Sequence, residues 1–462
     1  MPSTSMRILA SALIMAVTGV SLLACDADEA GDDSTLTVWS LEDVADRVTA
    51  TKALIADFTA RTGTKVDLVT INEDQFPALI ATSAASGELP DVVGSVSLAG
   101  VRTLAGNELL HPSANGEVVD ALGRQTFSAR ALELTAEGNK QLAVPSDGWG
   151  QLLVYRKDLF AAAGLPAPDT YEKIAAAAAK LHTGGIAGIT AATASGDVFT
   201  QQTFEHLALA NNCQLTDDSG AVKLDSPECV EAFRFYGDLM RTSSVKGAQD
   251  VDTTRATYFA GKAAMLIWSP FILDELAGLR DDAKPTCPQC RTDPTFLARN
   301  SGFVTGIKGP NAAEPAQYGE ISSWAVLDGA ADPAKSLVQF MLGDGYPRWF
   351  GMSPEGRFPV RKGTADDPEK FLTAWNASQA GVDRKQPLAQ VYGDDVLANL
   401  RRSPDSFQRW GITQGQGALV GAILGELPVP RALADVVSGK SDAPAAARRA
   451  KKDVEAIKAG VN

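Results

Sequence analysis

The sequence is poor in histidine, in net positive charge and in catalytic signatures. Its three histidines, His111, His182 and His206, show no metal-ligand spacing. The 42 Lys and Arg against 56 Asp and Glu give a formal net charge of −14, which argues against nucleic-acid binding and against a polybasic membrane patch. Nucleophile-elbow, H-E-x-x-H and P-loop patterns are missing as well. We therefore expect no metal, no cofactor and no nucleic-acid partner.

Long apolar runs are also scarce, and the one of note lies at the N-terminus. Arg7 is the only charged side chain before Asp26, and Ile8–Ala24 between them is uncharged and rich in Leu, Ile, Val and Ala. A positive residue followed by such a segment is the pattern of an export signal. A spanning helix needs about 20 apolar residues, so this run is slightly short for an uncleaved anchor, which is the alternative.

The end of this run, Leu22-Leu23-Ala24-Cys25, resembles the lipobox of bacterial lipoproteins. In that class a peptidase cuts before the cysteine, which then carries the lipid. The resemblance implies a signal peptide over residues 1–24, a lipidated Cys25 and a protein anchored to the outer face of the cell membrane. Residues 25–35 are rich in Asp and have the composition of a disordered tether.

Cysteine is rare, and its count agrees with export. Besides Cys25 the chain has four cysteines, Cys213, Cys229, Cys287 and Cys290. An even number outside the cytoplasm predicts two disulfides, and the first pair encloses a predicted turn and a helix start. The C-x-x-C pair at 287 and 290 also fits a redox motif or half a zinc site. We favour a local disulfide there, because it lies in a proline-bearing loop and no second C-x-x-C follows.

The mature chain opens with alternating strand and helix patterns. We expect strands at 36–39, 65–71 and 89–93, and helices at 47–62 and 76–86. Such alternation predicts a parallel α/β sheet, in which ligands bind at the carboxyl ends of the strands. The expected binding edge therefore contains Ser40–Asp43, Asn72–Gln75 and Gly94–Ser97.

Several short motifs follow in an order typical of one protein family. They are Leu36-Thr-Val-Trp39, Gly87-Glu-Leu-Pro-Asp-Val-Val93, Tyr155-Arg-Lys-Asp-Leu-Phe-Ala-Ala-Ala-Gly-Leu165, Pro168-Asp-Thr-Tyr-Glu172, Asp225-Ser-Pro-Glu228 and Tyr258-Phe-Ala-Gly-Lys-Ala-Ala-Met265. Together they resemble the extracellular solute-binding proteins, family 1, of ABC importers, the group that includes maltose-binding protein. Arg156 and Tyr171 depart from the family pattern, where Asn and Trp are usual. The motifs span most of the mature chain.

The resemblance implies a two-lobed periplasmic-binding-protein fold, a type II-like α/β clamp. One lobe is expected from residues 36–145 plus 320–346, and the other from 150–302 plus 357–462. Hinge crossings are expected near 143–155, 303–322 and 346–359, all rich in Gly, Pro and small residues. The expected protein is a monomer that binds a carbohydrate, mono- or oligosaccharide, and delivers it to membrane-embedded ABC permease subunits.

Sugar binding needs flat aromatic rings for the C–H face and bidentate polar groups for the hydroxyls. The candidates lie in loops after strands and in the crossings. They are Trp39, Glu42, Asp43, Ser95, Asp147, Trp149, Trp268, Ser323, Trp324 and Arg357. For Trp39 and Trp268 a place in the core is the alternative, and Arg357 has the alternative of a structural ion pair.

Two other function classes stay open at this point. A carbohydrate-active enzyme such as a glycoside hydrolase also uses aromatic residues and carboxylates, but no acid pair in the sequence stands out. A binding protein of the same fold for a polyamine would need several carboxylates beside aromatic rings. We expect a receptor and not an enzyme.

Overall fold

The larger of the two main β-sheets joins strands that lie far apart in the sequence. The computed structural model describes residues 35–461, so the predicted signal peptide, Cys25 and nearly all of the tether lie outside the described residues. The sheet has the order β11-β6-β10-β3-β1-β2, and β14 also pairs with β10. Its strands are β1 (Thr35–Ser40), β2 (Lys65–Thr70), β3 (Val92–Val96), β6 (Val144–Gly150), β10 (Gln317–Val326), β11 (Phe358–Pro359) and β14 (Phe407–Gln408).

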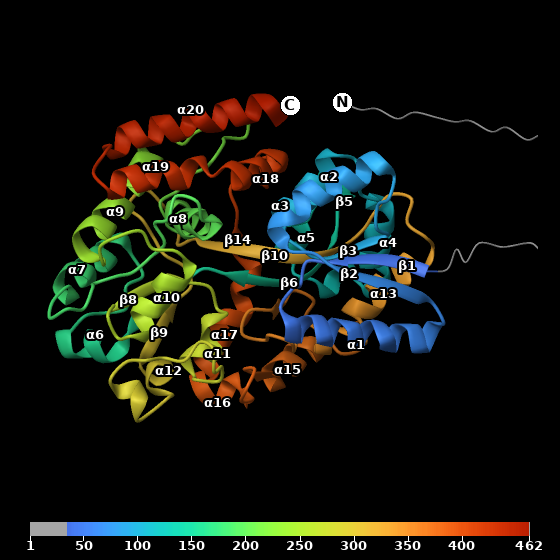
Figure 1. Cartoon of the computed structure of the whole chain (residues 1–462), viewed down its shortest axis with the longest axis horizontal. Coiled ribbons are helices and arrows are strands. Elements are labelled where there is room, and N and C mark those ends of the chain that lie inside the picture. Colours follow the sequence, from blue (N-terminus) through green and yellow to red (C-terminus); the bar gives the residue numbers. More distant parts are fainter. Residues whose placement is uncertain (1–34, 462) are drawn as a thin grey trace, which may run out of the picture. The chain divides into compact units, whose positions relative to one another are not determined.

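This sheet is parallel at one edge and mixed beyond it. Strand β1 pairs parallel with β2 and β3, which confirms the parallel sheet expected from the sequence. Strand β10 runs antiparallel to β3 and β6. Figure 1 shows α1 and α2 on opposite faces of the sheet. The helices of this part are α1 (Ala45–Thr62), α2 (Phe76–Ser86), α3 (Leu98–Gly106), α4 (Pro112–Leu122), α5 (Ala129–Leu134), α13 (Pro333–Leu342) and α14 (Tyr346–Phe350).

Local sequence explains where these elements begin and end. Helix α1 buries Leu54 and Phe58 and ends at Gly63, whose φ of 79° favours glycine. The third strand begins later than the expected position 89. Pro90 lacks a ladder donor, and the Asp91 carboxylate accepts hydrogen bonds from the backbone of Thr37 and Ala331, which fixes the segment before the strand starts.

A smaller sheet forms the second part of the fold. Strands β7 (Leu152–Arg156), β8 (Met265–Trp268) and β9 (Ser301–Val304) pair in the order β8-β7-β9. Thr190 forms a parallel bridge with Leu266, so the segment before α8 extends this sheet. The surrounding helices are α6 (Lys157–Ala163), α7 (Tyr171–Leu181), α8 (Val198–Ala210), α9 (Pro227–Ser243), α10 (Val251–Phe259), α11 (Ile272–Leu276) and α12 (Phe296–Asn300).

The remaining helices follow β11 in the sequence. They are α15 (Lys370–Ala377), α16 (Leu388–Tyr392), α17 (Asp394–Arg402), α18 (Gly417–Glu426), α19 (Pro428–Val437) and α20 (Ala443–Val461). Helix α20 confirms the amphipathic C-terminal helix and buries Val454 and Ile457. Within residues 35–461 no single helix is long and apolar enough to cross a membrane; α18 and α19 reach that threshold only as a pair bent by 52°.

Both predicted disulfides are present, Cys213–Cys229 and Cys287–Cys290. The first closes a small hairpin in which Thr216 pairs with Val222. Helix α9 begins directly afterwards, with the Ser226 hydroxyl accepting from the Cys229 amide. This pair therefore fixes the start of α9 against the core.

Candidate ligand-binding site

A buried polar network joins segments from four places in the sequence. Arg357, directly before β11, donates through Nη1 to Asp147 Oδ1 at 3.1 Å and through Nη2 to Glu42 Oε1. The Ser95 hydroxyl donates to the same Glu42 oxygen at 2.9 Å. Glu42 follows β1, Ser95 lies in β3 and Asp147 lies in β6. The structure thus brings four of the predicted site residues into direct contact.

Aromatic residues support this network from behind. The Trp349 indole Nε1 donates to Asp147 Oδ2 at 2.9 Å, and the Arg357 guanidinium lies 4.7 Å from the Trp349 ring centroid. Trp349 in turn contacts Trp324, with ring centroids 5.0 Å apart. Both tryptophans are fully buried, so the carboxylate and the guanidinium are held in fixed positions.

The charges of the network compensate one another. Burial alone would raise the pKa of Glu42, but the Arg357 and Arg47 guanidinium groups outweigh it and hold that pKa below its ordinary value. Burial alone would lower the pKa of Arg357, but Glu42 and Asp147 hold it above its ordinary value. Among the described residues, Nε of Arg357 has no hydrogen-bond partner. The network therefore stays ionised and retains one free donor.

Ser95 has an unusual backbone conformation for this position. Its φ of 59° lies in the left-handed region, which a non-glycine residue seldom adopts. Such conformations are found most often at functional sites. Here the conformation accompanies the hydrogen bond from the Ser95 hydroxyl to Glu42.

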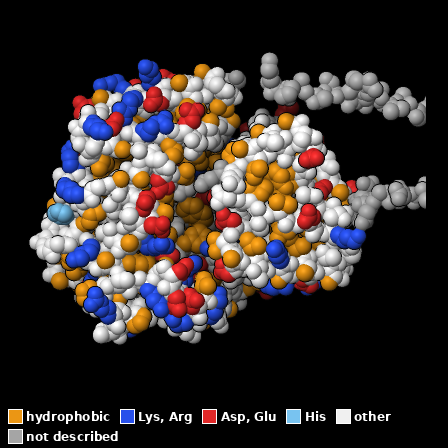
Figure 2. Space-filling view, in the orientation of Figure 1, with side chains coloured by type: hydrophobic (Ala, Val, Ile, Leu, Met, Phe, Trp, Pro, Cys, Tyr) orange, Lys and Arg blue, Asp and Glu red, His pale blue; other side chains and the backbone are white. Residues whose placement is uncertain are grey.

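Trp149 and Phe271, here called the aromatic pair, lie next to this network. Their ring centroids are 6.5 Å apart in an edge-to-face arrangement, and both side chains are half-buried. The Arg47 guanidinium lies 5.0 Å from the Phe271 ring centroid and reaches Glu42 Oε2 at 3.4 Å. The Phe271 ring packs on the backbone of Gly356, where a Cβ atom would lie 2.2 Å from it. Figure 2 shows a hollow in the surface with an apolar floor and charged side chains on its walls.

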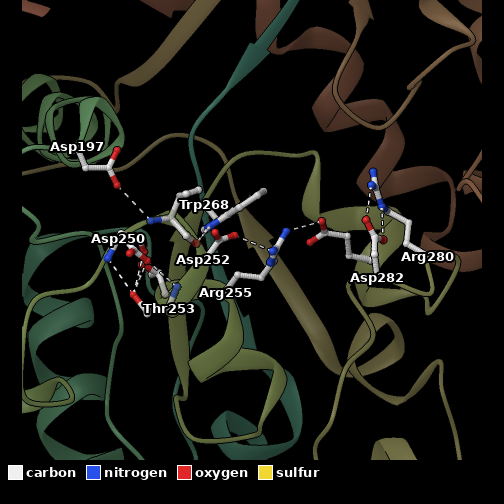
Figure 3. A network of polar contacts seen from close by, with 11 residues as sticks. Asp197, Asp250, Asp252, Thr253, Arg255, Trp268, Arg280 and Asp282 are labelled. Atoms are coloured by element: carbon white, nitrogen blue, oxygen red, sulfur yellow. Dashed lines mark hydrogen bonds and ion pairs between the residues drawn. The ribbon is translucent and has the colours of Figure 1, made fainter. Parts of the chain in front are cut away.

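Trp268 lies in a second polar network, at the end of β8 (Figure 3). Its indole Nε1 donates to the Val251 carbonyl at 3.2 Å, and its ring is 5.7 Å from the Phe199 ring. Arg255 lies 5.8 Å from the indole and binds Asp252 and Glu275, each at 2.8 Å. Only 7% of Trp268 is exposed, so in this structure it is part of the core.

Three buried acids lie close to the aromatic pair. Burial raises the pKa of Asp274 to about 6 and that of Glu275 to about 7. Burial, reinforced by the charge of Asp274, raises the pKa of Glu355 to about 8. At neutral pH, Glu355 therefore carries a proton.

The other predicted site residues take different positions. Trp39 is 8% exposed and packs in the core, and Ser323 and Trp324 are fully buried. Asp43 is exposed and accepts from the Asn72 amide at 2.8 Å. Trp324 cannot contact a ligand from its place in the core, because β10 turns its side chain toward Trp349.

Sequence reasoning did not identify Arg47, Phe271, Asp274 or Glu355. Phe271 follows Trp268 by one turn, and Glu355 lies in the expected crossing at 346–359, so position was a usable signal for both. Arg47 lies in the first turn of α1, and a positive charge there, shortly after the Glu that follows a strand, was a weaker signal.

Two α/β parts around a buried polar network and an aromatic pair define a ligand-binding protein. The chain belongs to the bacterial extracellular solute-binding proteins, whose family model matches residues 42–346. It therefore has the two-lobed fold of that family and is an extracellular solute-binding protein.

Among curated proteins, the chain is 28% identical over 309 residues to YcjN of Escherichia coli strain K12, which is named as an ABC transporter periplasmic-binding protein. That match spans 65% of this chain and 66% of YcjN, slightly under two thirds of each.

Three solved structures illustrate the fold. The GacH receptor of Streptomyces glaucescens, solved unliganded and with acarbose, has a TM-score of 0.67 at 18% identity over 92% of this chain and 98% of its own. The cyclic α-maltosyl-1,6-maltose binding protein of Arthrobacter globiformis has a TM-score of 0.68 at 19% identity, and the match covers 92% of this chain and 98% of its own. A solute-binding protein of Thermotoga lettingae bound to α-D-tagatose has a TM-score of 0.68 at 20% identity, and the match covers 92% of this chain and 99% of its own.

Proposed function

We propose that this protein binds a carbohydrate between its two lobes and presents it to an ABC import permease. The observation that carries the proposal is the Glu42–Arg357–Asp147 network beside the aromatic pair. Fixed carboxylate and guanidinium groups suit vicinal hydroxyls, and aromatic rings suit the C–H face of a sugar. The three solved structures described above, which share the fold, were solved with or are named for acarbose, α-D-tagatose and cyclic α-maltosyl-1,6-maltose.

The geometry suggests how a sugar would be held. The half-buried Trp149 ring offers an apolar surface, and the Glu42 carboxylate, held in place by Arg357, offers acceptor oxygens. Because the network is already assembled, little side-chain entropy has to be lost on binding, which favours affinity.

The proposed mechanism is closure of the lobes around the ligand. The lobes are those expected from residues 36–145 plus 320–346 and from 150–302 plus 357–462, with the crossings as hinges. A ligand shifts the balance toward the closed form only if it binds that form better. Small-angle scattering should then show a smaller radius of gyration with sugar, and an unchanged radius at saturation would contradict closure.

The location and state of the protein complete the proposal. Cys25 carries the lipid that anchors the protein to the outer face of the cell membrane, and the protein acts as a monomer without enzymatic activity. The support is the lipobox-like Leu22-Leu23-Ala24-Cys25 run and the fit of the site to binding.

Calorimetric titration with a panel of mono- and oligosaccharides tests the proposal. Binding of at least one sugar is expected, with no new reducing ends formed during a prolonged incubation. Trp149→Ala should weaken that binding about tenfold or more, since aromatic hot spots often contribute 2 kcal/mol. The matched control Trp410→Ala truncates a buried tryptophan that packs on Phe204 and donates to the Cys213 carbonyl, and it should leave the affinity of the folded fraction unchanged. Hydrolysis of the sugar would favour the enzyme alternative.

A further inference from the structure

Three buried carboxyl groups beside the aromatic pair have unsatisfied oxygens. Asp274, Glu275 and Glu355 are each at most 5% exposed. Within residues 35–461, Oδ1 of Asp274 and Oε2 of both glutamates have no hydrogen-bond partner. Buried polar atoms are rarely left unpaired, so three in one place require an explanation.

These acids surround Phe271. Asp274 follows it by one helical turn on α11, and Glu355 directly precedes Gly356, on whose backbone the Phe271 ring packs. The charge of Asp274 raises the pKa of Glu355, although less than burial does, so the two carboxyl groups are close. Both also feel the positive charge of Arg47, which lies over the Phe271 ring.

Two of the carboxyl groups near Phe271 lack a direct ion pair. Glu42 and Asp147 pair with Arg357, and Glu275 pairs with Arg255. No described residue forms a salt bridge with Asp274 or Glu355. The charges of Arg280 and Asp282, which bind each other at 3.0 Å, act on Asp274. The charge of Lys385, which donates to a backbone carbonyl, acts on Glu355. Both acids act on Tyr392, which donates to the Leu273 carbonyl.

One cation already lies on this aromatic surface. The Arg47 guanidinium, brought by α1, lies 5.0 Å from the Phe271 centroid and reaches Glu42. A positive group over an aromatic face is stabilised by the ring quadrupole. The face of the Phe271 ring therefore accommodates a positive charge.

We infer that the ligand carries a protonated amine, and that amino sugars are the preferred class of carbohydrate. An ammonium group donates three hydrogen bonds and brings one positive charge. It would donate to the free oxygens of Asp274 and Glu355 and pair with the charge of Asp274, which a neutral hydroxyl cannot do. The raised pKa values of these acids agree with a site whose cation comes with the ligand.

A polyamine has the same ammonium chemistry, and the structure favours the amino sugar. The Glu42–Arg357–Asp147 network alternates acceptors and donors, which suits hydroxyl groups and offers little to a chain of methylenes and amines. This inference rests on the carbohydrate-binding function proposed above.

Calorimetry at pH 6 with three probes tests it: the glucosamine dimer chitobiose, its neutral counterpart N,N′-diacetylchitobiose, and spermidine. At that pH an amine with a pKa of about 7.7–8 is protonated. We expect chitobiose to bind at least tenfold more tightly than its acetylated counterpart. Titration in buffers of different ionisation enthalpy should show proton release, because the ammonium lowers the pKa of the carboxyl groups.

The outcomes separate this inference from the proposed function. If N,N′-diacetylchitobiose binds as tightly as chitobiose or more tightly, the inferred amine on the ligand is overturned, while the proposed carbohydrate binding stands. If only spermidine binds, the inferred amine on the ligand is supported, and the proposed carbohydrate binding is overturned. If neither amine binds, the inference is overturned, whatever neutral sugars bind.

Variants locate the amine. Glu355→Gln keeps the size of a side chain that is protonated at neutral pH, and it should reduce the preference for chitobiose at least fivefold and diminish proton release. Asp274→Asn should do the same, and it serves if the first variant does not fold. Glu172→Gln, an exposed acid on α7, is the matched control and should change neither quantity. An undiminished preference in both folded site variants would overturn the inference.

Discussion

Replacing Arg357 by methionine should destabilise the protein strongly at neutral pH and much less in acid. Arg357 is 2% exposed and its partners Glu42 and Asp147 are 8% and 1% exposed, so the variant buries two carboxylates without their counter-charge. Breaking a buried ion pair from one side costs about 3–5 kcal/mol. Methionine keeps most of the volume, so the lost charge and its hydrogen bonds account for most of that cost.

The pH dependence identifies the cause. Without the guanidinium, the pKa of Glu42 is no longer held down by its strongest charge partner, so the carboxyl group takes up a proton as the pH falls toward 4. The difference in unfolding free energy between wild type and variant should shrink accordingly. Urea denaturation followed by tryptophan fluorescence, repeated from pH 4 to pH 8, measures it.

A matched control is available in α14. Arg348 pairs with Asp57 at 2.7 Å but is 51% exposed, so Arg348→Met should cost about 1 kcal/mol or less. If Arg357→Met costs no more than this control, or if its cost is the same at pH 4 and pH 8, the buried network does not have the energetic role assigned to it.

Four further predictions concern stability and location. The folded-state pKa of Glu355 is raised from 4.5 to about 8, so the stability that this carboxyl group contributes is fully present below its unfolded-state pKa and is lost as the pH rises to about 8. Glu355→Gln should therefore flatten the fall of the unfolding free energy over that pH range, measured by denaturation at a series of pH values. An unchanged dependence of the unfolding free energy on pH would argue against this role. Trp268→Ala should cost about 3–5 kcal/mol, because the indole is packed in the core; an unchanged urea midpoint would contradict that packing. Replacing Cys213 and Cys229 by serine should lower the unfolding free energy by about 3 kcal/mol. Removing the Cys287–Cys290 disulfide should cost less, because its sequence separation is 3 and that of the first pair is 16. Equal denaturation midpoints of the two variants would contradict this difference. Cys25→Ala should release the protein from the membrane fraction, and retention there would refute lipidation at this residue.

The sequence allowed prediction of the elements that depend on local pattern. The first strands and helices, both disulfides and the C-terminal helix follow from periodicity, glycine stops and cysteine count. Glu42, Ser95, Asp147 and Arg357 were identifiable because strand ends and crossings of this fold meet in space. The contact of Glu42 with Ser95 then follows from the parallel pairing of β1 with β3.

The tryptophans and the acids were harder to predict for a physical reason. Whether Trp324 faces the site or the core depends on the register of β10, since neighbouring side chains alternate between faces. Phe271 meets Gly356 and Arg47 only through tertiary packing of α11 and α1. Burial and mutual repulsion, which set the pKa values of Asp274 and Glu355, cannot be read from local sequence.

The most direct test of the carbohydrate-receptor proposal is a crystal structure of the protein with a sugar that calorimetry has shown to bind. The proposal predicts a sugar between the lobes, with hydroxyl groups on Glu42 and Arg357 and a C–H face on Trp149. A sugar bound elsewhere, with the Glu42–Arg357–Asp147 network untouched, would contradict it.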